Sequence, residues 1–178
     1  MPDTTPPIRV LHLEDSLRDA ELIRGTLESG GPAYDVVHVD SRARFESALA
    51  GGPFDVIICD FNLPDLDGLT ALRLVKDKLS ETPVIIVSGA IDPAEAVECL
   101  KEGATDYLLK QRLERLPSAV NRAIEETEQR RQHLQMAEKL REGEERFRQL
   151  AEQSNEGFWF VALKPERISY VSPAVEKI

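Results

Sequence analysis

Short, continuous apolar runs alternate with helix-like segments along the first 110 residues of the chain. The apolar runs occupy residues 8–13, 34–39, 54–60, 83–89 and 106–110. The segments between them show helical spacing of apolar residues, and several begin with a capping residue and end at glycine. Strands that are apolar throughout, rather than at alternate positions, are covered on both faces. The pattern therefore predicts an α/β fold, with a five-stranded parallel, doubly wound sheet and helices on each side.

The composition and charge narrow the class of protein. Hydrophobic residues make up 42% of the chain and charged residues 30%, as in globular domains, and the net charge of −10 disfavours nucleic acid as a partner. No apolar run approaches the roughly 20 residues that span a bilayer, and no signal peptide is visible at the N-terminus. Cys59 and Cys99 lie in apolar or helical contexts typical of buried thiols. We expect a cytoplasmic protein without a membrane partner.

A long, charged segment from residue 113 to 150 predicts a continuous helix that extends the fifth helix of the sheet domain. It contains no proline after Pro117, and apolar residues recur along it in an intermittent seam. A helix this polar has little to pack against by itself, so we expect a linker that forms a homodimeric coiled coil. The heptad pattern is imperfect, because Arg130 and Arg131 occupy expected core positions and Gly143 interrupts the seam.

Polar residues stand where four of the five predicted strands end. Glu14 and Asp15 follow the first strand, Asp60 ends the third, Ser88 lies at the end of the fourth and Lys110 at the end of the fifth. Ligands of open parallel sheets bind beyond the carboxyl ends of the strands. Three carboxylates in one crevice repel each other by roughly 3 kcal/mol per pair at ~5 Å and an effective dielectric of about 20. A divalent cation such as Mg²⁺ removes that cost.

The chemistry that fits this arrangement is phosphoryl transfer to a carboxylate. Asp60 would be the nucleophile and would form an aspartyl phosphate. Glu14 and Asp15 would hold Mg²⁺ beside Asp60, and Asn62 could offer its backbone carbonyl to the metal.

The remaining residues of the predicted site would handle the phosphoryl group. Lys110 would neutralise charge on its oxygens, Ser88 would donate its hydroxyl, and Gly89 would leave room for the donor. Each residue also has an ordinary structural interpretation. Asp60 could be a turn acid, the two acids before Ser16 could be helix-start acids favoured by the helix dipole, Ser88 a loop hydroxyl and Lys110 a surface lysine. Their joint placement in strand order favours the functional interpretation.

Four segments carry a resemblance to a known family. The segments LEDS (13–16), ICDFNLPDLDG (58–68), PVIIVSGA (83–90) and GATDYLLK (103–110) resemble the receiver domains of two-component response regulators, over residues 8–125. The resemblance implies a flavodoxin-like fold. It also implies Mg²⁺-dependent phosphorylation of Asp60 by a histidine kinase or phosphotransfer protein, with dephosphorylation catalysed by the domain itself.

The same resemblance implies a conformational switch. Ser88 and Tyr107 stand where the family has its switch hydroxyl and switch aromatic, although Tyr107 could equally be a packed edge-strand ring with its hydroxyl in water. The family usually has Lys-Pro at the end of the fifth strand, whereas this chain has Lys110-Gln111. That departure puts the usual dimer face in doubt.

The ends of the chain complete the predicted organisation. Residues 1–7 are expected to be a disordered tail, and residues 151–178 resemble the first part of a PAS sensor domain, with strands at 158–162 and 168–171. The aromatic residues at 158–160 are either ordinary core residues or part of a ligand pocket, so no PAS ligand is assigned.

Two functions from different classes follow from these features. One is a phosphorelay module that signals through the fifth helix to a PAS domain and an output domain beyond residue 178, such as a sensory histidine kinase or a cyclic-dinucleotide enzyme. The alternative is a receiver-fold module for dimerisation or protein binding in which phosphorylation is weak or lost.

Overall fold

The computed structural model describes residues 6–29, 31–90, 92–153, 159–163 and 166–171, with side chains described as far as Ala151. The chain divides into two compact units, Met1–Gln129 and Arg130–Ile178, which we describe separately. Most of the tail predicted at residues 1–7 and the end of the predicted PAS fragment lie outside the described residues.

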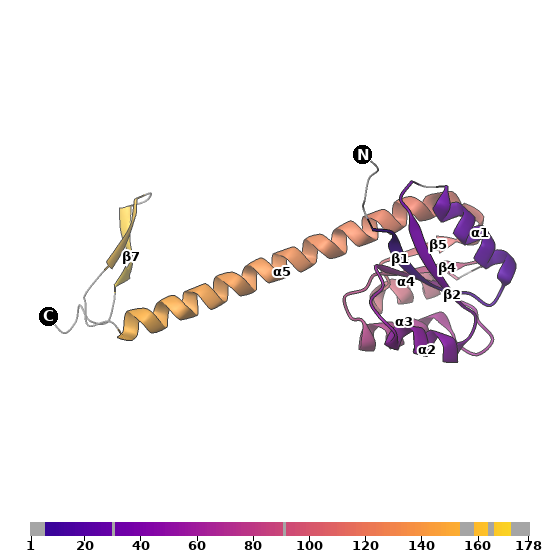
Figure 1. Ribbon diagram of the computed structural model, residues 1–178, viewed down its shortest axis with the longest axis horizontal. Helices are drawn as coiled ribbons and strands as arrows, with labels where there is room; N and C mark the ends of the chain where they lie inside the picture. The colour runs from indigo at the N-terminus through magenta and orange to yellow at the C-terminus, as the bar shows by residue number, and fades with distance from the viewer. Residues whose placement is uncertain (1–5, 30, 91, 154–158, 164–165, 172–178) are drawn as a thin grey trace. The chain divides into compact units, whose positions relative to one another are not determined.

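The first unit is built on one parallel sheet (Figure 1). Its strands lie in the order β2-β1-β3-β4-β5, and the predicted five-stranded, doubly wound sheet is confirmed. The strands are β1 (Ile8–Leu13), β2 (Tyr34–Val39), β3 (Val56–Asp60), β4 (Val84–Ser88) and β5 (Asp106–Leu109). The central strands β3 and β4 are buried at every position, which is why their sequences are apolar without alternation.

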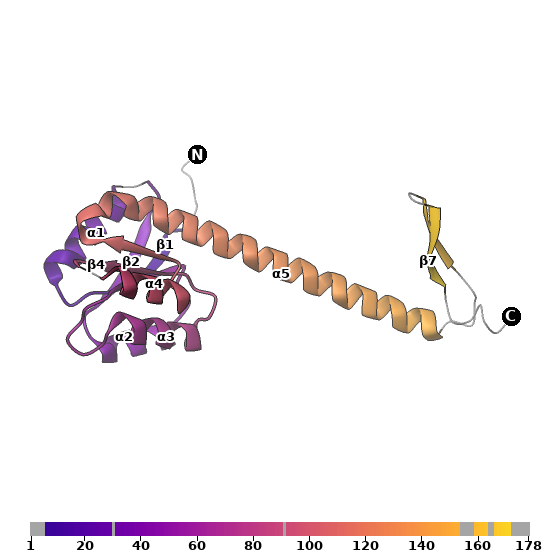
Figure 2. The same cartoon turned by 180° about the vertical axis from the view of Figure 1, so that it is seen from behind.

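Helices cover both faces of the sheet, as Figures 1 and 2 show from opposite sides. They are α1 (Leu17–Glu28), α2 (Arg42–Ala50), α3 (Gly68–Lys78), α4 (Pro93–Lys101) and α5 (Leu116–Gln153). One core cluster joins α2, α3 and α4 to the sheet through residues such as Phe45, Leu72 and Cys99. The other joins α1 and the start of α5 to the opposite face through residues such as Ile23 and Val120.

The passage from β5 into α5 differs from the sequence prediction. We expected the fifth strand to include Lys110 and the helix to start near residue 113. Instead, β5 ends at Leu109, a 3₁₀ turn occupies Lys110–Arg115, and α5 begins at Leu116. Arg112 within the turn has non-helical backbone angles. Pro117 fits directly after this start, because the first turn of an α-helix has no hydrogen-bond partner for the N–H that proline lacks.

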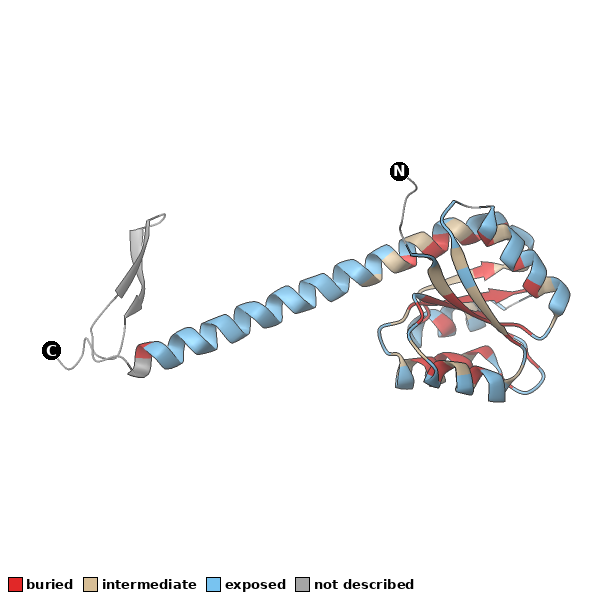
Figure 3. Cartoon of the chain, in the orientation of Figure 1, coloured by how far each residue is buried: buried red, intermediate tan, exposed pale blue. Residues whose placement is uncertain are grey.

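The second unit contains the exposed part of α5 and a strand pair. Leu134, Met136, Leu140 and Leu150 are each more than half exposed, and Figure 3 shows this part of the helix as almost entirely exposed. The strands β6 (Trp159–Leu163) and β7 (Glu166–Val171) are antiparallel, close to the strands predicted at 158–162 and 168–171. Among the described residues, no helix is both long enough and apolar enough to cross a membrane.

Substitution of two glycines measures how tightly Gly68 packs against the loop after β3, with Gly25 of α1 as the comparison. A Cβ atom built on Gly68 would lie 2.9 Å from Cα of Phe61, whereas one on Gly25, at an exposed position of α1, meets nothing within 4 Å. We predict that Gly68→Ala lowers the free energy of unfolding by about 1–3 kcal/mol, because the Phe61 backbone must move. Gly25→Ala should raise it by about 0.5–1 kcal/mol through helix propensity. Urea unfolding measures both, and a neutral Gly68→Ala would contradict the tight approach.

Candidate metal centre and its lysine

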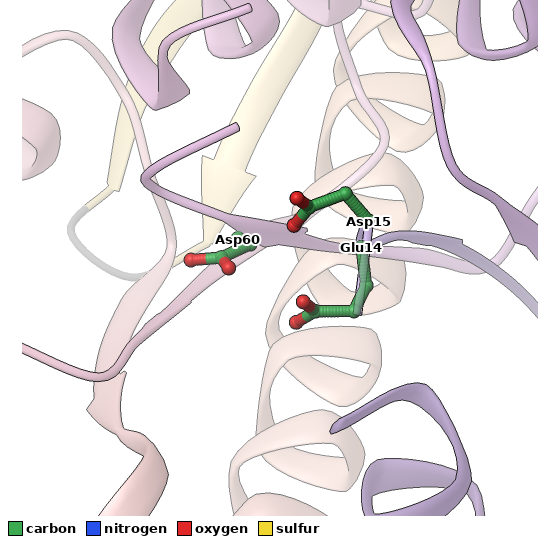
Figure 4. Close-up of side chains that lie close together, drawn as sticks. All are labelled: Glu14, Asp15 and Asp60. Carbon is green, nitrogen blue, oxygen red and sulfur yellow. The ribbon is translucent and has the colours of Figure 1, made fainter. Parts of the chain in front are cut away.

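Three carboxylates meet at the carboxyl ends of β1 and β3. Asp60 is the last residue of β3, and Glu14 and Asp15 directly follow β1, which pairs with β3 in parallel. Each carboxylate offers one oxygen, and these oxygens lie within 4.8 Å of one another; Figure 4 shows the side chains of Glu14 and Asp15 extending toward the side on which Asp60 lies. Glu14 and Asp60 are buried, at 1% and 6% exposure, while Asp15 is exposed.

Lys110 supplies the positive charge at this cluster. Its Nζ atom lies 2.7 Å from Oε2 of Glu14 and 2.9 Å from Oδ2 of Asp60. A third carboxylate, Asp19 of α1, lies 2.7 Å from the same nitrogen. The structure thus brings together the predicted residues of the first, third and fifth strands around one ammonium group.

The pKa shifts reflect this crowding of charges. Burial alone would lower the pKa of Lys110, but its close contacts with Asp19, Glu14 and Asp60 outweigh burial and raise it. The pKa of Glu14 is raised because burial, together with the nearby charge of Asp60, outweighs the stabilising contact with Lys110. In addition, one ammonium faces the carboxylates of Glu14, Asp60 and Asp19, with Asp15 in the same acidic group. Oxygen ligands of this kind suit Mg²⁺, and a dication bound by Glu14, Asp15 and Asp60 would relieve the remaining repulsion.

Asn62 and Ser88 each form one short-range hydrogen bond at the site. The backbone N–H of Asn62 donates to Oδ1 of Asp60 at 3.2 Å, which orients the carboxylate. The predicted use of the Asn62 carbonyl as a metal ligand stays a prediction. Ser88 is buried at the end of β4, and its hydroxyl donates to the carbonyl oxygen of Ala90 at 3.1 Å.

Gly89 and Gln111 connect β4 to the turn after β5. Gly89 is exposed, and its carbonyl oxygen accepts a hydrogen bond from Nε2 of Gln111 at 2.7 Å. The residue that replaces the usual proline therefore contacts the residue next to Ser88.

Tyr107 points its hydroxyl away from solvent. The ring packs against the core cluster of α2, α3 and α4, and the hydroxyl oxygen is buried with no hydrogen-bond partner among the described residues. Burial raises the pKa of the phenol. The alternative in which this hydroxyl lies in water is thus not the arrangement in the structure.

Sequence reasoning missed Asp19. An acid in the first turn of a helix is ordinarily explained by the helix dipole, so the residue carried no separate signal. The only available clue was its position one helical turn after the Glu14-Asp15 pair, on the helix that the strand-end acids lead into.

Fold and site together define an α/β domain with an acidic cluster that could hold a cation at the carboxyl ends of its strands. The model of the response regulator receiver domain family matches residues 10–121, and the chain belongs to that family. Proteins of this family take part in two-component phosphorelay and bind Mg²⁺ through acidic residues. The family match ends at residue 121, so it does not test the PAS resemblance of residues 151–178.

Relatives and solved structures agree with this assignment. The chain is 36% identical over 104 residues to response regulator protein FleR of Pseudomonas aeruginosa, covering 57% of this chain but 21% of FleR. It is 37% identical over 107 residues to two-component response regulator ORR11 of rice, covering 58% of this chain and 71% of ORR11. A response regulator receiver domain protein from Clostridium thermocellum has a TM-score of 0.60 at 30% identity, covering 68% of this chain and 97% of that structure.

His12 gives a prediction about stability and pH. Burial, followed by the charges of His38, Lys110 and Arg24, lowers its pKa from 6.5 to about 3. The unfolded chain therefore binds a proton below pH 6.5 that the folded protein does not, and folding stability falls as the pH drops. From pH 7.5 to 5, this residue should remove about 2 kcal/mol of stability.

Urea unfolding of the wild type and of His12→Leu at pH 7.5 and pH 5.0 measures the effect. The wild type should lose about 2 kcal/mol more than the variant between the two values. The control His133→Leu, at an exposed position of α5, should keep the wild-type pH dependence. Equal losses in the wild type and in His12→Leu would contradict the prediction.

Proposed function

We propose that this chain is a phosphorylatable receiver whose acceptor is Asp60. The observation that carries the proposal is the position of this carboxylate. It is buried at the end of β3, beside two acids able to bind a cation and 2.9 Å from the Lys110 ammonium. A structural turn acid needs no such surroundings.

The proposed reaction transfers a phosphoryl group from phosphohistidine of a histidine kinase or phosphotransfer protein. An Asp60 oxygen forms the new P–O bond, the P–N bond breaks, and the electron pair leaves with the imidazole, which then takes a proton. Lys110 neutralises charge on the phosphoryl oxygens, and the Asn62 N–H keeps the acceptor carboxylate oriented. Bound Mg²⁺, held by Glu14, Asp15 and Asp60 with the Asn62 carbonyl, would supply further charge neutralisation.

Ser88, Gly89 and Tyr107 would report the phosphorylated state. The Ser88 hydroxyl would exchange its hydrogen bond to the Ala90 carbonyl for one to a phosphoryl oxygen. Gly89 is exposed and has no side chain, so it would not block the approach of the phosphodonor. The Tyr107 hydroxyl has no partner among the described residues, so turning the ring breaks no hydrogen bond there. Such a movement would alter the face formed by α4, β5 and α5.

The wider organisation that we propose is a receiver over 8–125, a helical linker over 113–150 and the start of a PAS domain over 151–178. The output would be a sensory histidine kinase or a cyclic-dinucleotide enzyme in the same chain, in the cytoplasm. A solved relative is a sensor protein from Polaromonas, with 28% identity and a TM-score of 0.61. The complete acid cluster argues against the alternative of a purely dimerising module.

The phosphorylation proposal predicts the gain of one phosphoryl group when the protein is incubated with acetyl phosphate and Mg²⁺. Intact-mass spectrometry measures the gain, which hydroxylamine and chelation of Mg²⁺ should each abolish. Asp60→Asn should lose the modification because it removes the nucleophile. The matched control Asp65→Asn, an exposed acid of the same loop, should keep it. Modification of Asp60→Asn to the wild-type level would exclude this acceptor.

The dimer proposal rests on the exposed apolar residues of the second unit, including Leu134 and Leu140. Light scattering of the chain should give twice the mass of one protomer. The same measurement on a chain that ends at Gln129 should give the mass of one protomer. The shorter chain must keep the start of α5, because Leu116, Ala119 and Val120 belong to the core of the first unit. Monomeric masses for both chains would contradict the coiled coil.

A further inference from the structure

We propose that Asp19 is a positioning residue that acts through Lys110 and sets the charge balance of the phosphoryl-acceptor site. The inference rests on the proposed function of Asp60 and concerns how that site is regulated. Asp19 lies outside the acidic cluster that could hold the cation, and its contact is with the lysine.

The fold holds Asp19 in place through a short chain of hydrogen bonds. Oε1 of Glu14 accepts from the backbone N–H of Ser16 at 3.1 Å, and Oγ of Ser16 accepts from the backbone N–H of Asp19 at 3.3 Å. The Asp19 carboxylate then accepts from Nζ of Lys110 at 2.7 Å. Because Nζ also lies 2.7 Å from Oε2 of Glu14, the contacts close into a ring around the first turn of α1. The position of Asp19 is therefore coupled to that of a proposed metal ligand.

Lys110 cannot keep all its carboxylate contacts when it also binds a phosphoryl oxygen. Three carboxylate oxygens lie within 2.9 Å of Nζ: those of Asp19 and Asp60 accept its hydrogen bonds, and Oε2 of Glu14 forms a close ion pair with it. A phosphoryl oxygen that binds Nζ therefore competes with these three oxygens for the ammonium group. The side chains of Glu14 and Asp60 are 1% and 8% exposed, whereas that of Asp19 is 33% exposed. Asp19 is the partner that water can most readily solvate, so it is the one released.

Asp19 also changes the net charge of the site. Glu14, Asp15 and Asp60 balance one Mg²⁺ and the Lys110 ammonium, so the charge of Asp19 leaves the site with one net negative charge. Its carboxylate and that of Asp60 hydrogen-bond to the same nitrogen, which keeps the two charges close. This excess charge strengthens the attraction for a cation and weakens the approach of an anionic phosphodonor.

The inference predicts that Asp19→Asn moves two measurements in opposite directions. By isothermal titration, the dissociation constant for Mg²⁺ should rise about 3- to 10-fold, because one nearby negative charge is lost. At saturating Mg²⁺, the initial rate of phosphorylation by acetyl phosphate should rise about 2- to 5-fold, because Lys110 is released and repulsion of the donor falls. A merely structural role for Asp19 would weaken Mg²⁺ binding and slow phosphorylation together.

Two variants complete the test. Asp19→Glu restores the charge and should return both measurements to within about twofold of the wild type. Glu21→Gln makes the same charge change at an exposed position of α1, and it should also stay within about twofold, since its effect is only a screened surface charge.

The outcomes separate the two proposals. A wild type that takes no phosphoryl group from acetyl phosphate refutes the proposed function. A phosphorylated wild type with Asp19→Asn unchanged in both measurements, or slower together with weaker Mg²⁺ binding, refutes the role of Asp19 alone. The same shifts in Glu21→Gln would also refute it, because they would show a general surface charge effect.

Discussion

The contact of the Lys110 ammonium with the buried carboxylates is the interaction on which the site depends. Glu14 and Asp60 are almost fully buried, and a buried carboxylate without a partner is strongly unfavourable. Lys110 contacts both with a single positive charge, whereas the carboxylate oxygens of Glu14, Asp15 and Asp60 lie within 4.8 Å of one another, so negative charges outnumber positive ones in the cluster. A cation bound there would relieve the repulsion between these carboxylates, and the proposed chemistry depends on this property of the site.

The parallel sheet makes this arrangement possible. Five strands that run in one direction place all their carboxyl ends at one edge, so residues from positions 14, 60 and 110 meet although they are far apart in the sequence. Apolar residues fill both faces up to that edge, with Cys59 buried immediately before Asp60. The change from apolar to polar at each strand end is thus the boundary between the core and the site.

The sequence allowed the sheet, the helices and most of the site to be predicted, because each depends on a local pattern. Apolar runs indicated the strands, and the polar residues at their ends indicated the position of the site. Asp19 could not be predicted in this way, because its contact with Lys110 depends on where α1 lies against the sheet. The 3₁₀ turn at Lys110–Arg115 was missed for a similar reason: its residues have no distinctive pattern, and the contacts of Leu113 with the core determine the path of the chain.

Gln111 shows how a departure from the family pattern changes the connections of the site. A proline has no side-chain donor, whereas Gln111 donates to the Gly89 carbonyl next to Ser88. Lys110 and Gln111 are consecutive, so one short segment contacts both the carboxylates and the loop after β4. The same segment continues through Leu113 into α5, whose first turns are buried in the core. Adjacent residues of this segment therefore connect the carboxylate cluster and the Gly89 carbonyl to the start of α5, and this is the physical route by which the proposed switch would reach the helix.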